Sequence, residues 1–310
     1  MKGTNLNRFI LVLAVALVGC ASPKVDAPGA KSASGAKSSA ADPTADAFAS
    51  QSLATYFVQR DGARTLTLIA AAVKQAPNRA DIQYLQVALC RQIEGCGAEP
   101  FEARLRKLDP GNAIVWLRTL SDAQRQRDVS VEGQVLDVIG RAERFDVYWP
   151  SLVAGLTTAR NSGPAGLEVA LNETVGWLAG TAVPSLQPLT AACTRVRLSD
   201  STWAERCRRV ARVMMRSDTY IVESFGIAIA KQVSVGDPVE LAKLDERERT
   251  ARYLWRTSAE IIGSQVERDK FAAEHLKLMR SVKREQDVHS AITRWAGRPT
   301  TPPEDFRMDE

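Results

Sequence analysis

Two histidines are the first candidates for metal binding or acid–base catalysis, because imidazole titrates near neutral pH and often binds metals. His275 and His289 are the only histidines in the 310 residues. We expect both on one long helix over 265–297, where their separation of 14 residues corresponds to roughly 21 Å. They cannot share a metal ion at that distance, and no His-rich or Cys-rich tract supplies further ligands. The sequence therefore predicts packing histidines, no metal site and no cofactor.

A second candidate is the dipeptide Glu223-Ser224. It resembles the catalytic Glu-Ser of soluble-type lytic transglycosylases, periplasmic enzymes that cleave peptidoglycan with one general-acid glutamate. The resemblance implies that a protonated Glu223 is the catalytic acid. However, the later motifs of that family are absent, and the residues that follow simply continue a helix. The alternative is that Glu223 and Lys231 lie on the solvent side of an amphipathic helix, in which case no enzyme is expected.

The N-terminus places a thiol directly after an apolar run. Lys2 and Arg8 precede ten apolar residues, 9–18, and the sequence then continues with Gly19 and Cys20. Ten residues are half of the roughly 20 that a membrane-spanning helix needs. We therefore interpret residues 1–19 as a signal peptide and not as a membrane span.

The ending Leu17-Val18-Gly19-Cys20 resembles the lipobox of bacterial lipoproteins. The resemblance implies diacylglycerol on the Cys20 thiol, cleavage before Cys20 and acylation of the new N-terminus. Two or more acyl chains anchor a protein stably, since each buried methylene contributes about 0.8 kcal/mol. Residue 21 is Ala and not the Asp that retains such proteins at the inner membrane of enteric-type bacteria, so the outer membrane is implied. The alternative is a plain signal peptide with a chance cysteine.

The mature chain would start with a polar tether. Residues 20–44 are almost entirely Ala, Ser, Gly, Pro, Lys and Asp, so we expect a lipid anchor followed by a flexible tether. Without residues 1–19, 291 residues remain and the net charge falls from +5 to +3, because Lys2 and Arg8 are removed. This excess is too slight to indicate a nucleic-acid partner.

Four further cysteines could bind a metal or form disulfides: Cys90, Cys96, Cys193 and Cys207. Their spacings, C-x5-C and C-x13-C, match no zinc finger or ribbon, and an even count in an exported chain favours oxidation. We predict the local pairs Cys90–Cys96 and Cys193–Cys207. In a continuous helix Cys90 and Cys96 would lie roughly 9 Å apart, beyond the roughly 7 Å limit for bonded cysteines. The helix must therefore end between them, and Gly95 suits a left-handed turn there.

Hydrophobic periodicity is helical from residue 45 to 297, and no stretch alternates as a strand does. We therefore predict an all-α fold. Three segments also echo one another: 75–85 (QAPNRADIQYL), 108–117 (LDPGNAIVWL) and 144–149 (RFDVYW). Their aromatic residues Tyr84, Trp116 and Trp149 are 32 and 33 residues apart.

This spacing is similar to the period of about 34 residues in tetratricopeptide repeats. The resemblance implies a solenoid of helical hairpins over 45–160, in which the three aromatic residues pack between repeats. An irregular helical region over 161–297 and a disordered Pro-rich tail over 298–310 would follow. The alternative is an irregular all-α domain whose hairpins happen to be similar in length.

The motifs of common enzymes are missing from the sequence. It contains no Gly-rich phosphate loop, no Gly-x-Ser-x-Gly elbow and no paired-carboxylate metal motif. Stacked helical hairpins typically bind segments of other proteins. We therefore expect a lipid-anchored periplasmic scaffold or adaptor that binds other envelope proteins through a helical-repeat surface. The alternative is a peptidoglycan-active or accessory cell-wall enzyme that uses Glu223.

Overall fold

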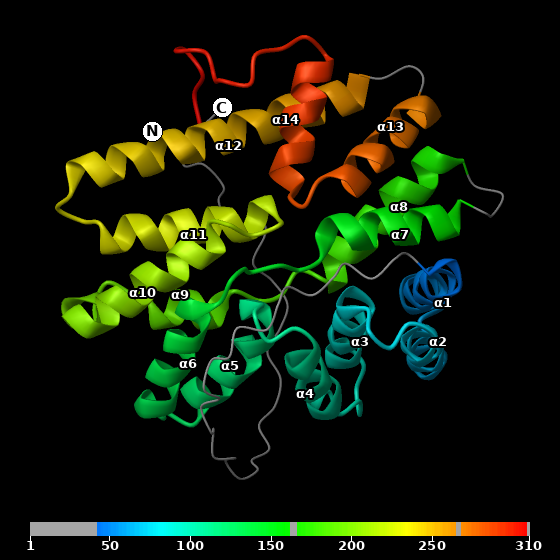
Figure 1. The fold of residues 1–310 in the computed structure, drawn as a ribbon, viewed down its shortest axis with the longest axis horizontal. Coiled ribbons are helices and arrows are strands. Elements are labelled where there is room, and N and C mark those ends of the chain that lie inside the picture. The colour runs from blue at the N-terminus through cyan, green and yellow to red at the C-terminus, as the bar shows by residue number, and fades with distance from the viewer. Residues whose placement is uncertain (1–41, 162–165, 265–267, 309–310) are drawn as a thin grey trace, which may run out of the picture. The chain divides into compact units, whose positions relative to one another are not determined.

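The computed structural model describes residues 42–308, except 162–165 and 265–267. Every regular element within these residues is a helix, as the ribbon shows (Figure 1). The predicted all-α class is therefore confirmed. The predicted signal peptide, the lipidated Cys20 and almost all of the tether lie outside the described residues.

The α-helices, in chain order, are α1 (Pro43–Ala54), α2 (Gly62–Gln75), α3 (Ala80–Gln92), α4 (Glu99–Leu108), α5 (Leu117–Arg125), α6 (Val129–Arg141), α7 (Trp149–Arg160), α8 (Leu167–Thr181), α9 (Gln187–Ala192), α10 (Ser201–Met214), α11 (Tyr220–Val233), α12 (Pro238–Ser264), α13 (Arg268–Ser281) and α14 (Glu285–Trp295). Three shorter segments are η1, a π-helix at Thr55–Gln59, and the 3-10 helices η2 (Ala113–Trp116) and η3 (Arg197–Ser199). In the part of the chain that the structure covers, no helix combines the length and the apolar character that a membrane span requires.

Aspartates at the N-cap position start several helices. The side chain of Asp42 accepts hydrogen bonds from the backbone N–H groups of Thr44 (2.9 Å) and Ala45 (3.1 Å), and Pro43 suits the first helical position. Helix α1 therefore starts two residues before the domain boundary expected at residue 45. The same capping occurs at Asp61, Asp128 and Asp200.

Neighbouring helices pack as hairpins, but the chain also makes contacts that an open solenoid lacks. Helix α1 packs on α2, α2 on α3, α3 on α4, and α5 on α6. Helix α1 also packs on α7, and α6 packs on α10, far along the chain in both cases. In a repeat array each unit contacts only its sequence neighbours. The structure therefore shows an all-α packing and does not confirm a tetratricopeptide-like solenoid.

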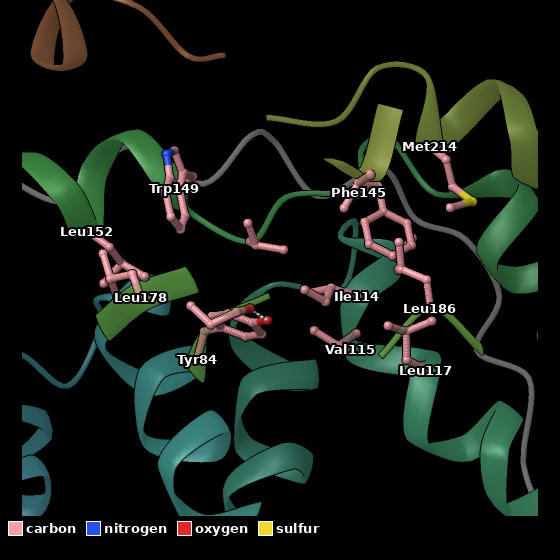
Figure 2. Packing of buried hydrophobic residues seen from close by; sticks show 14 of the residues in the cluster. Tyr84, Ile114, Val115, Leu117, Phe145, Trp149, Leu152, Leu178, Leu186 and Met214 are labelled. Carbon is pink, nitrogen blue, oxygen red and sulfur yellow. Dashed lines mark hydrogen bonds between the residues drawn. The ribbon is translucent and has the colours of Figure 1, made fainter. Parts of the chain in front are cut away.

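The hydrophobic core is a continuous cluster to which helices from α1 to α14 contribute. Figure 2 shows Tyr84, Trp149 and Leu178 on one side of a close-up and Phe145 and Met214 on the other. Tyr84 is 3% exposed and Trp149 is 6% exposed.

The three echoed aromatic residues do not occupy equivalent positions. Tyr84 lies within α3, Trp116 ends the 3-10 helix η2, and Trp149 is the first residue of α7. Trp116 is only partly buried at the edge of the core, where the guanidinium of Arg106 lies 5.7 Å from its ring centroid. Of the three, therefore, Tyr84 and Trp149 are core residues and Trp116 is peripheral.

The long helix expected over 265–297 is two helices, α13 and α14. The break occurs before Glu285, whose backbone N–H donates to the carbonyl of Asp218 (2.9 Å). The Glu285 carboxylate also accepts from the backbone N–H of Tyr220 (2.8 Å), at the start of α11. These contacts to a distant segment compete with helix continuation, and a hairpin replaces the single helix.

The C-terminal segment differs from the disordered tail that the sequence predicts. Residues 298–308 lie along α12, where the Tyr253 hydroxyl donates to the carbonyl of Pro299 (3.1 Å) and the Phe306 ring lies 5.3 Å from the Tyr253 ring. Arg252 donates to the carbonyl of Met308 (2.8 Å). A Pro-rich segment has few N–H groups to satisfy, so donors on one helix can fix its free carbonyls.

Candidate functional site

Polar residues of the second and third echoed segments meet in the fold. The Asn112 side chain donates to the carbonyl of Asp146 (2.9 Å) and accepts from the Asp146 N–H (3.0 Å). Beside it, the Ala113 N–H donates to the carbonyl of Arg144 (2.9 Å). We call Asp109, Asn112, Arg144, Asp146 and Asp218 the turn cluster. It joins two turns that are more than thirty residues apart in the sequence.

Two of the three acidic residues of the turn cluster share one guanidinium. Arg144 forms ion pairs with Asp109 and with Asp146, the latter at 3.1 Å. The Tyr148 hydroxyl donates to the second oxygen of Asp109, which is 2% exposed. Burial and the neighbouring Asp109 charge raise the pKa of the Tyr148 hydroxyl. Both oxygens of Asp109 are therefore occupied by donors from the chain.

Asp218 holds the start of α7. Its two carboxylate oxygens accept from the backbone N–H groups of Val147 (2.9 Å) and Trp149 (2.7 Å). These N–H groups belong to a helix terminus, where they lack helical partners. Burial and the neighbouring Asp146 raise the pKa of Asp218 well above its usual value. Burial also raises the pKa of Asp146 to about 6.

Three carboxyl groups close together suggest a metal site, but the turn cluster does not have the chemistry of one. Its carboxylate oxygens accept from backbone N–H groups, a tyrosine and an arginine of the chain itself. Within the residues that the structure describes, no group of three or more His, Cys, Asp or Glu could hold a metal ion. The turn cluster therefore joins segments of the fold.

Glu223, the candidate catalytic acid, is enclosed by cationic and amide donors. One carboxylate oxygen accepts from Arg247 at 2.6 and 2.8 Å. The other accepts from Arg284 (3.0 Å) and from the Gln286 amide (2.5 Å). We call these four residues the Glu223 clamp. It joins α11, α12 and α14 through a residue that is 4% exposed.

The clamp bears on both sequence-based interpretations of Glu223. The solvent-facing interpretation is wrong, because Glu223 is buried, whereas Lys231 pairs with Asp245 and Glu248 near the surface. A general acid must carry a proton and present it to a substrate. Two guanidinium groups and one amide surround the carboxylate, and their four hydrogen bonds occupy its lone pairs. This geometry is that of a structural anchor between helices.

A second arrangement of catalytic residue types occurs between α12 and α14, and the sequence analysis did not identify it. The Ser258 hydroxyl lies 2.7 Å from Nδ1 of His289, and Nε2 of His289 lies 3.8 Å from the Glu285 carboxylate. Serine, histidine and an acid in this order are typical of acyl-transfer enzymes.

A second acceptor competes with His289 for the serine proton. Ser258 also lies 2.9 Å from the carbonyl of Trp255, which can only accept. A serine hydroxyl has a single proton, so it cannot donate fully to both the Trp255 carbonyl and the imidazole. Ser258 is also 0% exposed. The Ser258 hydroxyl is therefore enclosed by the fold, and the packing role of His289 stays a prediction.

His275 lies nearer to His289 than one continuous helix would allow, because α13 and α14 form a hairpin. Burial and, to a smaller degree, the neighbouring His289 lower the pKa of His275 to about 4. Its Nε2 atom is buried without a hydrogen-bond partner in the described region. The expected separation of about 21 Å is therefore wrong, since it assumed a single helix.

Both predicted cysteine pairs are present, with Cα atoms 5.3 Å apart in Cys90–Cys96 and 5.7 Å apart in Cys193–Cys207. Helix α3 ends at Gln92, and Gly95 has a φ of 79°. The chain therefore reverses where the pairing requires it. The second disulfide links the end of α9 to the middle of α10.

Comparisons with known proteins yield no relative. No protein-family model, no curated protein and no solved structure matches this chain significantly. The function of the chain must therefore be argued from its own residues.

Proposed function

We propose that this protein is a lipid-anchored scaffold or adaptor of the bacterial cell envelope, attached through Cys20 to the periplasmic face of the outer membrane. The pairing of the cysteines carries this proposal. The chain has five cysteines, and the four beyond residue 20 form two disulfides. Disulfides are typical of exported proteins. Cys20 is left over, directly after an apolar run that suits a signal peptide.

The proposed activity is binding to other envelope proteins, without catalysis. The two constellations that contain catalytic residue types support this, because their polar atoms bond to other groups of the fold. Both oxygens of Glu223 are occupied, and Ser258 is buried against Trp255. No contact of Glu223 favours the alternative of a peptidoglycan-active enzyme.

The proposed binding surface is the helical region over 45–160. A tetratricopeptide-like arrangement remains part of this proposal. It is supported by the backbone hydrogen bond between Ala113 and Arg144, which pairs the second echoed segment with the third. Helical hairpins of this kind expose helix faces on which an extended segment or a helix of a partner can lie. The partner is proposed to be a protein of the same compartment.

The anchor is tested by fractionating cells that express the wild-type chain or Cys20→Ser. We expect the wild-type protein in the detergent phase, with residue 20 as its acylated N-terminus by mass spectrometry. Cys20→Ser should accumulate as an unprocessed precursor at the inner membrane, because the thiol is the acceptor of the first lipid. Wild-type protein in the aqueous phase, with a different N-terminus, would contradict the anchor.

The scaffold role is tested by crosslinking intact cells and identifying what co-purifies. We expect one envelope protein in large yield, and its crosslinks should map to residues 45–160. A parallel assay of the mature chain on purified peptidoglycan, with Glu223→Gln as the control, tests the enzyme alternative. Release of soluble fragments by the wild type alone would overturn the non-catalytic proposal.

A further inference from the structure

The outer face of α10 carries an unusual density of arginine. Five arginines lie within eleven residues: Arg206, Arg208, Arg209, Arg212 and Arg216. Arg206 and Arg209 turn toward α6, whereas the side chains of Arg208 and Arg212 are 46% and 58% exposed. Arg216, just beyond the helix end, is exposed and has no ion pair among the described residues. Arg208 and Arg212 are four residues apart and share one face of α10. Together with the exposed Arg216, which follows the helix, they form a set that we call the arginine row.

Two carboxylates only partly neutralise this region. Asp137 of α6 pairs with Arg206 (3.2 Å) and Arg209 (2.7 Å). Glu205 pairs with Arg208 and Arg212. Five guanidinium groups therefore face two carboxylates, beside an open groove of about 460 Å³ between α6 and α10. The region is complementary to an anionic partner, although the net charge of the whole chain is small.

Exposed apolar side chains lie on α11, the helix that follows the arginine row and packs on α10. Ile221 and Phe225, one turn apart on α11, are 44% and 40% exposed. Next to Phe225, Gly226 contacts α10 so closely that a Cβ atom there would lie 2.8 Å from Met214 and from the backbone of Met215. Phe225 therefore lies on the part of α11 that crosses α10 near the arginine row.

Arginines beside exposed aromatic and aliphatic side chains are typical of surfaces that bind a membrane interface. The cations bind anionic headgroups, and the apolar side chains enter the headgroup–acyl boundary. Only the 21 residues 21–41 separate Cys20 from the first helix cap, Asp42. A chain of 21 residues spans at most about 75 Å in any conformation, so an anchored domain would remain within that distance of the lipid surface.

We propose that the arginine row, with Ile221 and Phe225, docks on anionic phospholipids of the membrane that carries the anchor. This inference rests on the proposed lipid anchor and extends it. The acyl chains would hold the protein at the membrane, and the surface would orient the folded part against the headgroups. Stable attachment through two signals of this kind is common among peripheral membrane proteins.

The test uses the mature chain from residue 20 with Cys20→Ser and both disulfides formed, so that no lipid is attached. The probes are vesicles of phosphatidylcholine alone and vesicles with about one third phosphatidylglycerol. We expect co-sedimentation with the anionic vesicles only, weakening as salt screens the charges. The triple variant Arg208→Gln/Arg212→Gln/Arg216→Gln should bind about 100-fold more weakly, at about fivefold per residue.

The matched control is Arg60→Gln/Arg64→Gln/Arg127→Gln, which removes the same charge from exposed arginines elsewhere. It should retain at least a third of the wild-type affinity, and unchanged circular dichroism would show that both triple variants fold. Equal binding to neutral vesicles, an equal loss in both triple variants, or no binding to anionic vesicles would overturn the proposal. Capture of an acidic envelope protein by the arginine row, without vesicle binding, would overturn it as well.

The proposed docking surface and the proposed anchor can be contradicted independently of each other. If the unlipidated chain binds anionic vesicles through the arginine row while the wild-type chain carries no lipid in cells, the surface stands and the anchor falls. If the wild-type chain is lipidated but the unlipidated chain ignores anionic vesicles, only the anchor stands.

Discussion

Asp218 and Glu223 lie five residues apart and are similarly buried, at 3% and 4% exposure, yet they belong to different kinds of polar site. In the turn cluster, Asp218 accepts from two neutral backbone N–H groups and lies near other acids. In the Glu223 clamp, the carboxylate faces two guanidinium groups. The comparison shows that two carboxyl groups of similar burial can be held by different kinds of donor. Asp218 is held by backbone N–H groups near other acids, whereas Glu223 is held by the side chains of two arginines and a glutamine.

The largest loss expected on substitution of a polar residue follows from removing the acceptor of the turn cluster. Asp218→Ala leaves the N–H groups of Val147 and Trp149 without their acceptor, and each unsatisfied buried donor costs about 1–3 kcal/mol. We expect the free energy of unfolding in urea to fall by about 3–4 kcal/mol. Asp218→Asn is the control, since it keeps one acceptor oxygen for one of the two N–H groups. A smaller loss of about 1–2 kcal/mol is expected there, and equal losses in the two variants would refute the comparison.

Glu223→Gln tests the Glu223 clamp by replacing a carboxylate with an amide, as Asp218→Asn does in the turn cluster. The amide cannot neutralise Arg247 and Arg284, and removing one partner of a buried ion pair is strongly destabilising. We expect a loss of about 2–3 kcal/mol in the free energy of unfolding, because both arginines are partly exposed. Glu205→Gln is the matched control, since this exposed glutamate also pairs with arginines and should lose only about 0.5 kcal/mol. If Glu223→Gln were as mild as Asp218→Asn, the two sites would not differ in kind.

The turn cluster should also give stability a distinct pH dependence. The pKa of Asp146 is raised from 3.8 to about 6, so the folded state binds an extra proton between these values. Stability from this group is greatest below pH 3.8 and is lost as the pH rises through about 6. We expect Asp146→Asn to remove about 2 kcal/mol of this pH dependence, measured as the difference between urea titrations of the variant and the wild type. Asp305→Asn, at an exposed residue, should not change the curve; a flat difference for Asp146→Asn would count against the raised pKa.

The smallest effect is expected at Trp116, the echoed aromatic residue at the edge of the core. Trp116 is only partly buried, so Trp116→Ala should reduce the free energy of unfolding by about 1–2 kcal/mol. A fully buried aromatic residue such as Trp149 should lose about 3–5 kcal/mol on the same change. Thermal and urea unfolding of both variants gives the measurement. Equal losses would mean that the aromatic residues, and not the polar turns, join the echoed segments.

The local features of the fold could be predicted from the sequence because short-range rules govern them. The all-α class follows from hydrophobic periodicity, and the break between Cys90 and Cys96 follows from helix rise and disulfide length. The relation among the three echoed segments stays a prediction; in the structure, the turns of the second and third segments pair through Asn112 and Asp146. Their aromatic residues were assigned the joining role that the polar side chain of Asn112 has in the structure.

The surroundings of the candidate site could not be predicted, because they depend on residues distant in sequence. Glu223 meets Arg247 and Arg284 only through the packing of α11, α12 and α14. His275 and His289 approach one another only because contacts from Asp218 and Tyr220 to Glu285 interrupt the expected helix. Periodicity places a side chain on a face of its own helix, but it carries no information about which helix covers that face.

The sequence by itself determined the helical class, the two disulfides and the N-terminal pattern on which the proposed anchor rests, because each depends on residue types at short, fixed spacings. Only the tertiary structure decided which carboxyl groups are held by cations and which by backbone N–H groups. It also decided that the Pro-rich C-terminal segment lies along α12, and that the arginines of α10 exceed the acids around them. Each of these features depends on contacts from several segments of the chain, and the electrostatic state of a buried group is set by all of its surroundings.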